Sequence, residues 1–292
     1  MNSLGFDKKN NDTKIIVAMS GGVDSSVAAV LLKEEGYDVT GITLRLYNQV
    51  NREHSKSCCA GRDIEDAKKV AEQFDFPHYV LDYQDQFFLE VIDNFVESYA
   101  SGETPIPCIK CNQTVKFTDL LNVAKDQKVD ALVTGHYVRR IVGKKNAKMF
   151  KAKDTKKDQS YFLFATTREQ LNFLRFPIGE YYKSEIREIA KKLSLVVKDK
   201  PDSQDICFVT KDSYRTLIEK LKPESCSKGN IININGEKIG EHKGIANFTI
   251  GQRKGIGIGG YKKPLYVVDI NKTNNVIVLD EKKHLEKKEV QI

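Results

Sequence analysis

The sequence predicts an α/β protein in which a doubly wound parallel sheet is followed by a small, mostly β region. Three observations support this fold class. Short apolar runs alternate with segments of helical periodicity as far as residue 208, a glycine-rich loop follows the first run, and the chain becomes rich in glycine and β-branched residues from residue 229. Alternating strands and helices imply right-handed crossovers between parallel strands, and such sheets bind ligands beyond the carboxyl ends of their strands.

The predicted strands of this sheet are short and alternate with segments of helical periodicity. "KIIVAM" is continuously apolar, as expected for a strand that is buried on both faces. The lysine-rich residues 139–157 are predicted to form an insertion or a hairpin. The predicted strands are residues 14–19, 38–47, 78–83 and 130–138, and the predicted helices are residues 25–36, 61–75, 85–102, 114–127 and 181–195.

The sequence divides into three predicted domains. Residues 1–208 form the sheet domain. A helical segment, "KDSYRTLIEKLK", then leads into β-rich sequence, which predicts a small central domain over residues 209–263. A softer boundary is expected at Pro264, so that residues 264–292 begin a further β domain.

The net charge of +7 is unevenly distributed. Residues 144–157 contain seven lysines and one acidic residue, Asp154. Such a run is either a solvated face or a contact surface for a polyanion. No apolar run approaches the ~20 residues that a membrane span needs, and the first residues lack the apolar core of a signal peptide. We therefore expect a cytoplasmic protein without a membrane partner.

The loop "SGGVDSS", residues 20–26, lies between the first predicted strand and its helix. A Walker loop carries a lysine after its last glycine, and no G-K-[ST] occurs in this chain. Phosphate ligands must then be backbone amides, serine hydroxyls and the helix N-terminus, which Gly21 and Gly22 allow an anion to approach. Asp24 is expected to act through Mg²⁺ or to orient the loop. The loop therefore predicts nucleotide binding.

This stretch resembles the pyrophosphatase loop of the N-type ATP pyrophosphatases. Members of that superfamily cleave ATP between the α- and β-phosphates and adenylate a substrate oxygen. The resemblance implies an adenine-nucleotide alpha-hydrolase-like fold and a loop that holds the departing pyrophosphate. Because the superfamily has many chemistries, other parts of the chain must identify the reaction.

The six cysteines favour redox, sulfur or metal chemistry over a disulfide framework in a protein of this expected location. Cys108 and Cys111 are predicted to lie in a loop just before a helix, where the helix N-terminus would lower the pKa of a thiol. Cys207 lies in a second polar loop, "PDSQDICFV". Thiols placed in this way suit the transfer of sulfur to an activated substrate.

Other interpretations of the cysteines remain open on the residues alone. The C-x-x-C of Cys108 and Cys111 is half of a zinc site that Cys58 or Cys59 would complete. Cys226 is interpreted as an ordinary small buried residue.

Seven segments together resemble the tRNA-specific 2-thiouridylases, which install sulfur at C2 of the wobble uridine. The resemblance covers about residues 14–280, and no single segment would be specific. The segments are "AMSGGVDSSVAA", "SCCAGRDIEDAKKVA", "TPIPCIKCNQTVKF", "TGHYVR", "KDQSYFL", "DSQDICF" and "FTIGQRKGIGIGG".

The resemblance implies roles for residues of this chain, position by position. Cys111 matches the nucleophile of the family and Cys207 its persulfide-bearing cysteine. ATP binding is implied for Ala18, Met19, Ser20, Gly21, Gly22, Val23, Asp24, Ser25, Leu44 and Gly135. Contact with the target base is implied for Ile106, Pro107 and Cys108, and contact with tRNA for His136, Lys157, Asp158 and Gln159.

Two features depart from the family pattern. The usual loop is N-P-D-x-x-C, whereas here Ile106 replaces the asparagine and Cys108 the aspartate. The sequence also stops soon after "PLYVVDINKTNNVIVLDEKKHL", so residues 264–292 are expected to be the truncated start of the C-terminal β-barrel that helps these enzymes to hold tRNA.

The sequence therefore predicts an ATP- and Mg²⁺-dependent tRNA sulfurtransferase. It would use a persulfide on Cys207, assisted by Cys111, and its partners would be tRNA and a persulfide sulfur-donor protein. A minority hypothesis places a [4Fe–4S] cluster on Cys108, Cys111 and Cys207. The rival functions are another pyrophosphatase-loop ligase or amidotransferase, which would not need these cysteines, and a tRNA-binding remnant without turnover.

Overall fold

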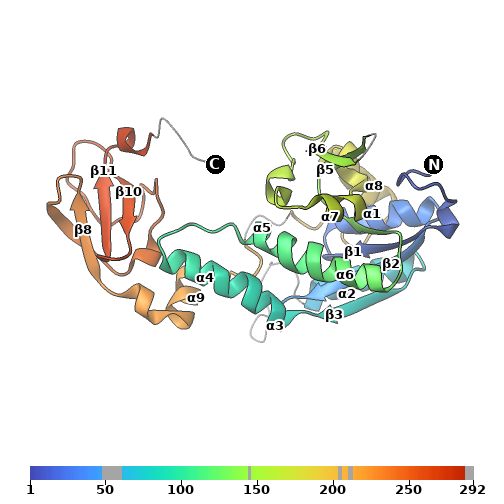
Figure 1. The fold of residues 1–292 in the computed structure, drawn as a ribbon, viewed down its shortest axis with the longest axis horizontal. Helices are drawn as coiled ribbons and strands as arrows, with labels where there is room; N and C mark the ends of the chain where they lie inside the picture. Colours follow the sequence, from blue (N-terminus) through green and yellow to red (C-terminus); the bar gives the residue numbers. More distant parts are fainter. Residues whose placement is uncertain (48–60, 144–145, 203–205, 210–212, 287–292) are drawn as a thin grey trace. The chain divides into compact units, whose positions relative to one another are not determined.

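The computed structural model describes residues 1–47, 61–143, 146–202, 206–209 and 213–286 (Figure 1). The chain forms two compact units. The first comprises residues 1–91 and 108–208, and the second comprises residues 92–107 and 209–292. No helix in the described part of the chain is long and apolar enough to cross a membrane.

The first unit is built on a five-stranded sheet in which every pair of neighbouring strands is parallel. The strand order is β3-β2-β1-β4-β7, so the order reverses direction between β1 and β4. In such sheets the ligand site lies outside the carboxyl ends of the strands at this reversal. The strands are β1 (Lys14–Ala18), β2 (Asp38–Arg45), β3 (His78–Asp82), β4 (Ala131–Thr134) and β7 (Leu174–Arg175). The predicted doubly wound parallel sheet is thus confirmed.

The sheet is covered on both faces, and successive apolar side chains of its central strand point to opposite faces. Ile15 and Val17 of β1 share one core with three helices, α1 (Val23–Glu34), α2 (Gly61–Gln73) and α8 (Lys183–Lys192). Ile16 lies between them in sequence, so its buried side chain points to the opposite face. There α6 (Leu121–Asp126) packs against β4. Burial of the central strand on both faces explains why it is continuously apolar.

The helical segment that carries Cys108 and Cys111 starts earlier than predicted. It consists of α5 (Pro107–Cys111), a π-helical stretch (Asn112–Leu120) and α6. The sequence analysis placed the two cysteines in a loop before residue 114, and the structure corrects this. Pro107 is the first residue of α5, a position where its fixed φ and missing N–H favour a helix start.

The predicted hairpin in the lysine-rich segment is confirmed. Strands β5 (Val138–Val142) and β6 (Ala147–Lys151) pair antiparallel. Lys144 and Lys145 lie outside the described residues. A 3₁₀ turn (Ser160–Leu163) and α7 (Arg168–Phe173) follow the hairpin.

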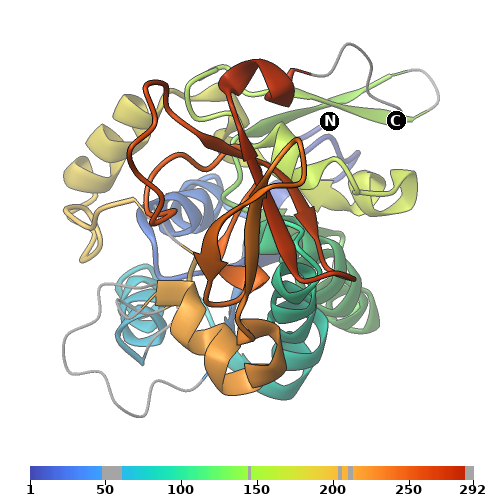
Figure 2. The same cartoon turned by 90° about the vertical axis from the view of Figure 1, so that its left-hand side faces the viewer.

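The second unit contains a four-stranded sheet with the order β10-β11-β8-β9 (Figure 2). Its strands are β8 (Gly229–Asn233), β9 (Lys238–His242), β10 (Tyr266–Asn271) and β11 (Val276–Asp280). The division expected at residue 264 falls inside this sheet, because β11 pairs parallel with β8. The sheet encloses its own apolar core, which includes Ile231, Val267 and Ile277.

Two helices of the second unit come from distant parts of the sequence. They are α4 (Asp93–Ala100) and α9 (Ser213–Leu221). Tyr99 and Tyr214 stack with ring centroids 4.6 Å apart. This packing explains why residues 92–107 belong with the C-terminal part of the chain, although the sequence analysis assigned them to the 1–208 domain.

Candidate functional site

The glycine-rich loop leaves the carboxyl end of β1 and enters α1, which places it at the reversal of strand order. Gly21 has a φ of +70°, and a Cβ added there would lie 2.1 Å from the carbonyl oxygen of Asp63. Gly22 is extended and caps α1. The Ser25 hydroxyl accepts a hydrogen bond from the Ser20 amide at 3.1 Å. The loop therefore presents helix N-terminal amides and hydroxyls, which are groups that bind anions in other proteins.

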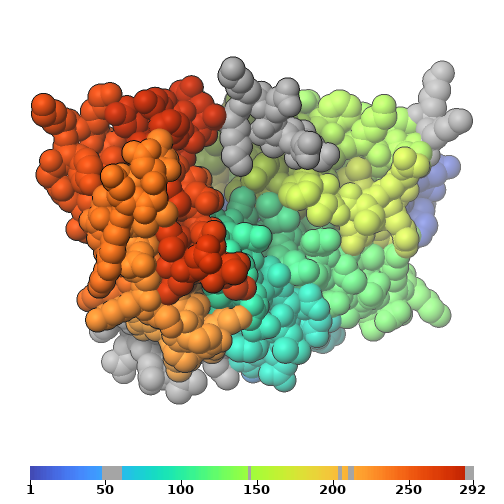
Figure 3. Space-filling model, turned by 60° about the vertical axis from the view of Figure 1, so that its left-hand side comes forward, coloured from blue at the N-terminus to red at the C-terminus, as the bar shows by residue number. Residues whose placement is uncertain are grey.

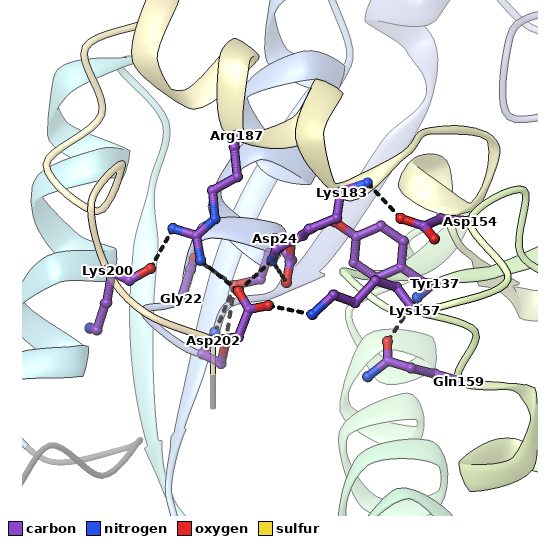
Figure 4. A network of polar contacts seen from close by, with 12 residues as sticks. Gly22, Asp24, Tyr137, Asp154, Lys157, Gln159, Lys183, Arg187, Lys200 and Asp202 are labelled. Carbon is purple, nitrogen blue, oxygen red and sulfur yellow. Dashed lines mark hydrogen bonds and ion pairs between the residues drawn. The ribbon is translucent and has the colours of Figure 1, made fainter. Parts of the chain in front are cut away.

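Asp24 lies in the first turn of α1 and receives two contacts from distant residues (Figure 4). The Tyr137 hydroxyl donates to its Oδ1 at 2.7 Å, and Lys183 Nζ lies 2.7 Å from both carboxylate oxygens. Burial, followed by the charge of Asp24, raises the pKa of Tyr137, so this phenol stays a donor. Lys183 is the first residue of α8, and its side chain is only 12% exposed. Lys183 thus supplies beside the loop the lysine that the loop's own motif lacks.

A second lysine contacts the same loop from the other side. Lys200 Nζ donates to the Gly21 carbonyl oxygen at 2.8 Å. It also pairs with Asp63 at 2.5 Å and with Asp66 at 2.7 Å, both on α2. Asp63 is 4% exposed, so a buried ion pair holds the glycine turn in position.

Asp202, five residues before Cys207 in the sequence, contacts three cations beside the candidate ATP site. Its carboxylate lies 2.7 Å from Lys157 Nζ, 2.9 Å from Lys183 Nζ and 2.5 Å from Arg187 (Figure 4). Burial disfavours the ionised form of Asp202, but the hydrogen bonds from Lys157 and Lys183 outweigh it and hold the pKa well below its usual range. This carboxylate is therefore charged throughout the physiological range and fixes three cations beside the loop.

The residues expected on the adenosine side lie at neighbouring strand ends. Leu44 is near the end of β2 and is 8% exposed. Gly135 directly follows β4, and a Cβ added there would lie 2.6 Å from the Ser25 amide nitrogen. Glycine thus lets the chain pass directly against the start of α1.

Gly135→Ala should weaken ATP binding at least about tenfold, because backbone atoms of the loop must move to admit a methyl group. Gly61→Ala is the matched control, since a Cβ at Gly61 meets nothing within 4 Å. Titration with ATP, alongside thermal unfolding of both variants, would check this. Wild-type ATP affinity in Gly135→Ala would contradict the assignment of this loop.

The four residues that the resemblance assigns to tRNA lie close to this network, and each has a partner within the protein. The Gln159 side chain accepts a hydrogen bond from the Tyr137 amide at 2.8 Å, and Asp158 accepts one from the Ala152 amide at 2.8 Å. His136 Nδ1 lies 2.8 Å from the Thr134 hydroxyl. Burial lowers the pKa of His136 to about 3, so it is neutral and cannot serve as a phosphate-binding cation. Lys157 pairs with Asp202, as described above.

Cys111 is 8% exposed, whereas Cys108, one turn earlier, is exposed. Burial raises the pKa of the Cys111 thiol, and nearby Lys116 opposes this only in part. The expected lowering of a thiol pKa at a helix start is therefore wrong for Cys111, which lies at the end of α5 and is desolvated. Ile106 and Pro107 belong to the second unit and Cys108 to the first, although the three are consecutive.

Alkylation should distinguish the two thiols of the C-x-x-C. At neutral pH iodoacetamide should modify Cys108 well before Cys111, because Cys111 is buried and its raised pKa keeps it protonated. Labelling of Cys111 should increase as the pH rises beyond the ordinary thiol range, where the thiolate forms. Peptide mass mapping of samples treated between pH 6.5 and about 10 would measure both rates. Equal labelling at neutral pH would contradict the burial of Cys111.

The structure does not support the iron–sulfur hypothesis. Cys108, Cys111 and Cys207 are all described, yet no group of three cysteine, histidine or acidic side chains in the described residues could hold a metal ion. Cys207 is half-buried, and its carbonyl oxygen accepts a hydrogen bond from the Tyr47 hydroxyl at 2.6 Å. Cys58 and Cys59, which the zinc alternative needs, lie outside the described residues.

Four residues of this network are not predicted from the sequence: Tyr137, Lys183, Lys200 and Asp202. Tyr137 follows His136 in "TGHY", so its position beside a predicted ligand-binding strand end was the only signal. Lys183 lies 159 positions from Asp24 in sequence. Such ion pairs leave no local pattern. The high density of lysines and aspartates in "KDKPDSQD" is the local sign that this segment makes polar contacts.

Comparison with known proteins places this geometry in a family. Residues 13–211 match the family model described as "tRNA methyl transferase HUP domain", and residues 215–280 match the "tRNA methyl transferase PRC-barrel domain". A solved 4-thiouridine synthetase–RNA complex with bound ATP shares 18% identity over 73% of this chain and 50% of that chain. Its TM-score of 0.44 is too low to support any inference.

Curated relatives are much more similar. Proteins named "tRNA-specific 2-thiouridylase MnmA" are 56% identical in Wolbachia sp. subsp. Drosophila simulans, 54% in Rhodospirillum centenum and 52% in Brucella canis. These matches cover 94%, 95% and 98% of this chain, and 74%, 73% and 72% of the respective relatives. The chain therefore belongs to the tRNA-specific 2-thiouridylase family.

Proposed function

We propose that this chain is an ATP-dependent tRNA-uridine 2-sulfurtransferase that replaces O2 of a wobble uridine with sulfur. The observation that carries this proposal is the site itself. A phosphate loop without a Walker lysine receives Lys183 from α8, and that lysine also pairs with Asp202, which lies five residues before Cys207 in the sequence. Membership of a family whose relatives are named 2-thiouridylases supports the same conclusion.

The first step is activation of the base. Uridine O2 attacks the α-phosphorus of ATP, the bond from that phosphorus to the bridging oxygen breaks, and pyrophosphate leaves with the electron pair. The amides and hydroxyls of residues 20–25 would bind the departing pyrophosphate. Lys183 and Lys200 would balance its charge. Asp24 suits Mg²⁺, since it is a partly exposed carboxylate at the phosphate loop, and the ion would neutralise phosphate charge.

The second step moves sulfur. The outer sulfur of a persulfide on Cys207 attacks C2 of the adenylated base, and AMP leaves with the former O2. The Cys111 thiol then attacks the inner sulfur of Cys207 and gives its proton to the departing 2-thiouracil. This breaks the persulfide bond and leaves the outer sulfur on C2. The products are 2-thiouridine and a Cys111–Cys207 disulfide, which a dithiol reductant must reduce before the next turnover. A persulfide-bearing donor protein would reload Cys207.

The family model's description mentions methyl transfer, and thiolation fits the site better. Methyl transfer uses no pyrophosphate site, whereas a loop of amides and hydroxyls with two lysines beside it suits the binding of ATP phosphates. The amidotransferase alternative also uses ATP but gives no role to Cys111 and Cys207.

The deciding experiment combines two measurements on the full chain. tRNA-dependent exchange of labelled pyrophosphate into ATP tests activation, and mass spectrometry of digested tRNA tests thiolation when a persulfide donor and a reductant are present. Exchange together with 2-thiouridine supports the proposal. Exchange without a thiolated nucleoside would favour a different ligase, and tRNA binding without exchange would favour the remnant.

A further inference from the structure

Two aromatic side chains near the candidate site are exposed to an unusual degree. Tyr161 is 62% exposed and Phe164 is 69% exposed, and their ring centroids lie 6.4 Å apart with an interplanar angle of 43°. The third ring of this segment, Phe162, meets Tyr161 edge-on at 5.8 Å. Two large rings that remain in water forgo the free energy of burial, so an exposed pair of this kind indicates a binding surface.

The short turn that carries these rings is held firmly from below. Leu163, between the two exposed rings, is 2% exposed and anchors the turn in the protein. The Phe162 amide donates to the Gln159 carbonyl oxygen at 3.0 Å, and the Gln159 amide donates to the Tyr137 carbonyl oxygen at 3.0 Å. The rings are therefore preorganised, which lowers the entropy cost of binding a flat partner.

The turn is also fixed beside the candidate nucleophile. Asn112, the residue after Cys111, is 3% exposed, and its side-chain amide donates to the Phe162 carbonyl oxygen at 3.2 Å. Lys116 Nζ in turn donates to Asn112 Oδ1 at 3.1 Å. A partner seated on the rings would thus lie near the place where the target uridine must be presented to Cys111.

The surface that leads to the rings is basic. The chain from β6 to the turn carries five exposed lysines, and the yellow-green part of Figure 3 shows this region at the molecular surface. The exposed lysines are Lys148, Lys151, Lys153, Lys156 and Lys157. Exposed aromatic rings beside a positive surface are typical of sites for unpaired nucleotides, in which lysines bind phosphates and rings stack on bases.

We propose that Tyr161 and Phe164 form a stacking platform for an unpaired tRNA base adjacent to the target uridine. This inference rests on the proposed function and names the part of the tRNA that the surface receives. A base next to the uridine that stacks on the platform would hold the loop open while the uridine itself turns toward Cys111. Flipping of this kind costs little in a single-stranded loop.

The first test measures tRNA affinity of the full chain as a function of salt. Tyr161→Ala and Phe164→Ala should each weaken binding about tenfold at every salt concentration without changing the salt slope or ATP affinity. Tyr161→Phe and Phe164→Trp should bind like the wild type. Lys156→Ala should instead make the salt slope shallower by about one unit. Tyr79→Ala, which removes a 58% exposed ring from β3, is the matched control and should change nothing.

The second test is a double-mutant cycle with an anticodon stem-loop. An abasic site next to the target uridine should weaken binding by the wild type about tenfold but cause no further loss in the Tyr161→Ala/Phe164→Ala protein. If the losses from the abasic site and from the alanine substitutions are fully additive at both neighbours of the uridine, the platform proposal is overturned. Wild-type RNA affinity in the alanine variants, with a change in self-association or stability, would also overturn it and show that the rings cover protein.

Thiolation measured in parallel separates the two proposals. RNA affinity that depends on the rings, in a chain that never forms 2-thiouridine, would overturn the proposed function and leave the platform standing. Normal thiolation with affinity independent of the rings would overturn the platform alone. A wild-type chain that does not bind tRNA would overturn both.

Discussion

Cys207→Ser and Cys111→Ser should each abolish thiolation while ATP binding survives. We expect a loss of more than about 1000-fold, because serine can neither carry a persulfide nor release its outer sulfur. ATP binding should persist, since the loop is held by Ser25, Lys200 and Lys183, which do not contact either thiol in the described network. Mass spectrometry of tRNA nucleosides and an ATP titration would measure the two properties on the same samples.

Two further cysteines serve as controls for this prediction. Cys226→Ser should retain activity near that of the wild type, because Cys226 belongs to the second unit and the mechanism gives it no role. Cys108→Ser should retain most activity, because the mechanism uses only Cys111 of the C-x-x-C. Full thiolation by Cys207→Ser would eliminate the persulfide route. Loss of activity in Cys108→Ser equal to that in Cys111→Ser would require a role for the exposed thiol that the mechanism lacks.

The fold of the first unit could be predicted because its signals are local. The continuously apolar run within Lys14–Ala18 indicates burial on both faces, and the glycine pair after it indicates a turn into a helix. The start of α5 could not be predicted as well, since "PCIKC" carries no apolar periodicity and only Pro107 marks the helix start. The parallel pairing of β11 with β8 was equally hidden, because strand pairing across about 45 residues leaves no mark in either strand.

The candidate site divides in the same way. Residues 18–25 could be predicted as a candidate phosphate loop from their order, since a strand, S-G-G-x-D-S and a helix follow one another directly. The environment of Cys111 was predicted with the wrong sign, because burial rather than proximity to a helix start sets its pKa. Lys183 and Asp202 were missed altogether. Their role comes from tertiary contact, and an ion pair between distant residues has no signature in a single sequence.

Lys183→Met should slow tRNA-dependent pyrophosphate exchange by about 100-fold or more. Lys183 lies between two carboxylates, 2.7 Å from Asp24 and 2.9 Å from Asp202. Without Lys183, Asp24 and Asp202 lose the cation that they share beside the incoming phosphates. Loss of a charge-assisted contact worth about 2.7 kcal/mol would account for the roughly 100-fold change in rate. Lys183→Arg should recover part of the rate, since the charge remains but the planar group fits the two carboxylates differently. Lys68→Met is the control, because Lys68 pairs with Glu72 at 3.7 Å on the exposed face of α2 and lies outside the basic surface.

Asp202→Asn should slow thiolation much more than it slows pyrophosphate exchange. Lys183 keeps Asp24 as a partner in this variant, so pyrophosphate exchange should fall only a few-fold. Thiolation should fall much further, because Asp202 lies five residues before Cys207 in the sequence and its contacts with Lys157, Lys183 and Arg187 fix the chain at that point. The measurement is the ratio of the 2-thiouridine rate to the exchange rate in wild type, Lys183→Met and Asp202→Asn. A ratio that is unchanged in Asp202→Asn would show that this carboxylate serves ATP activation alone and does not position the sulfur carrier.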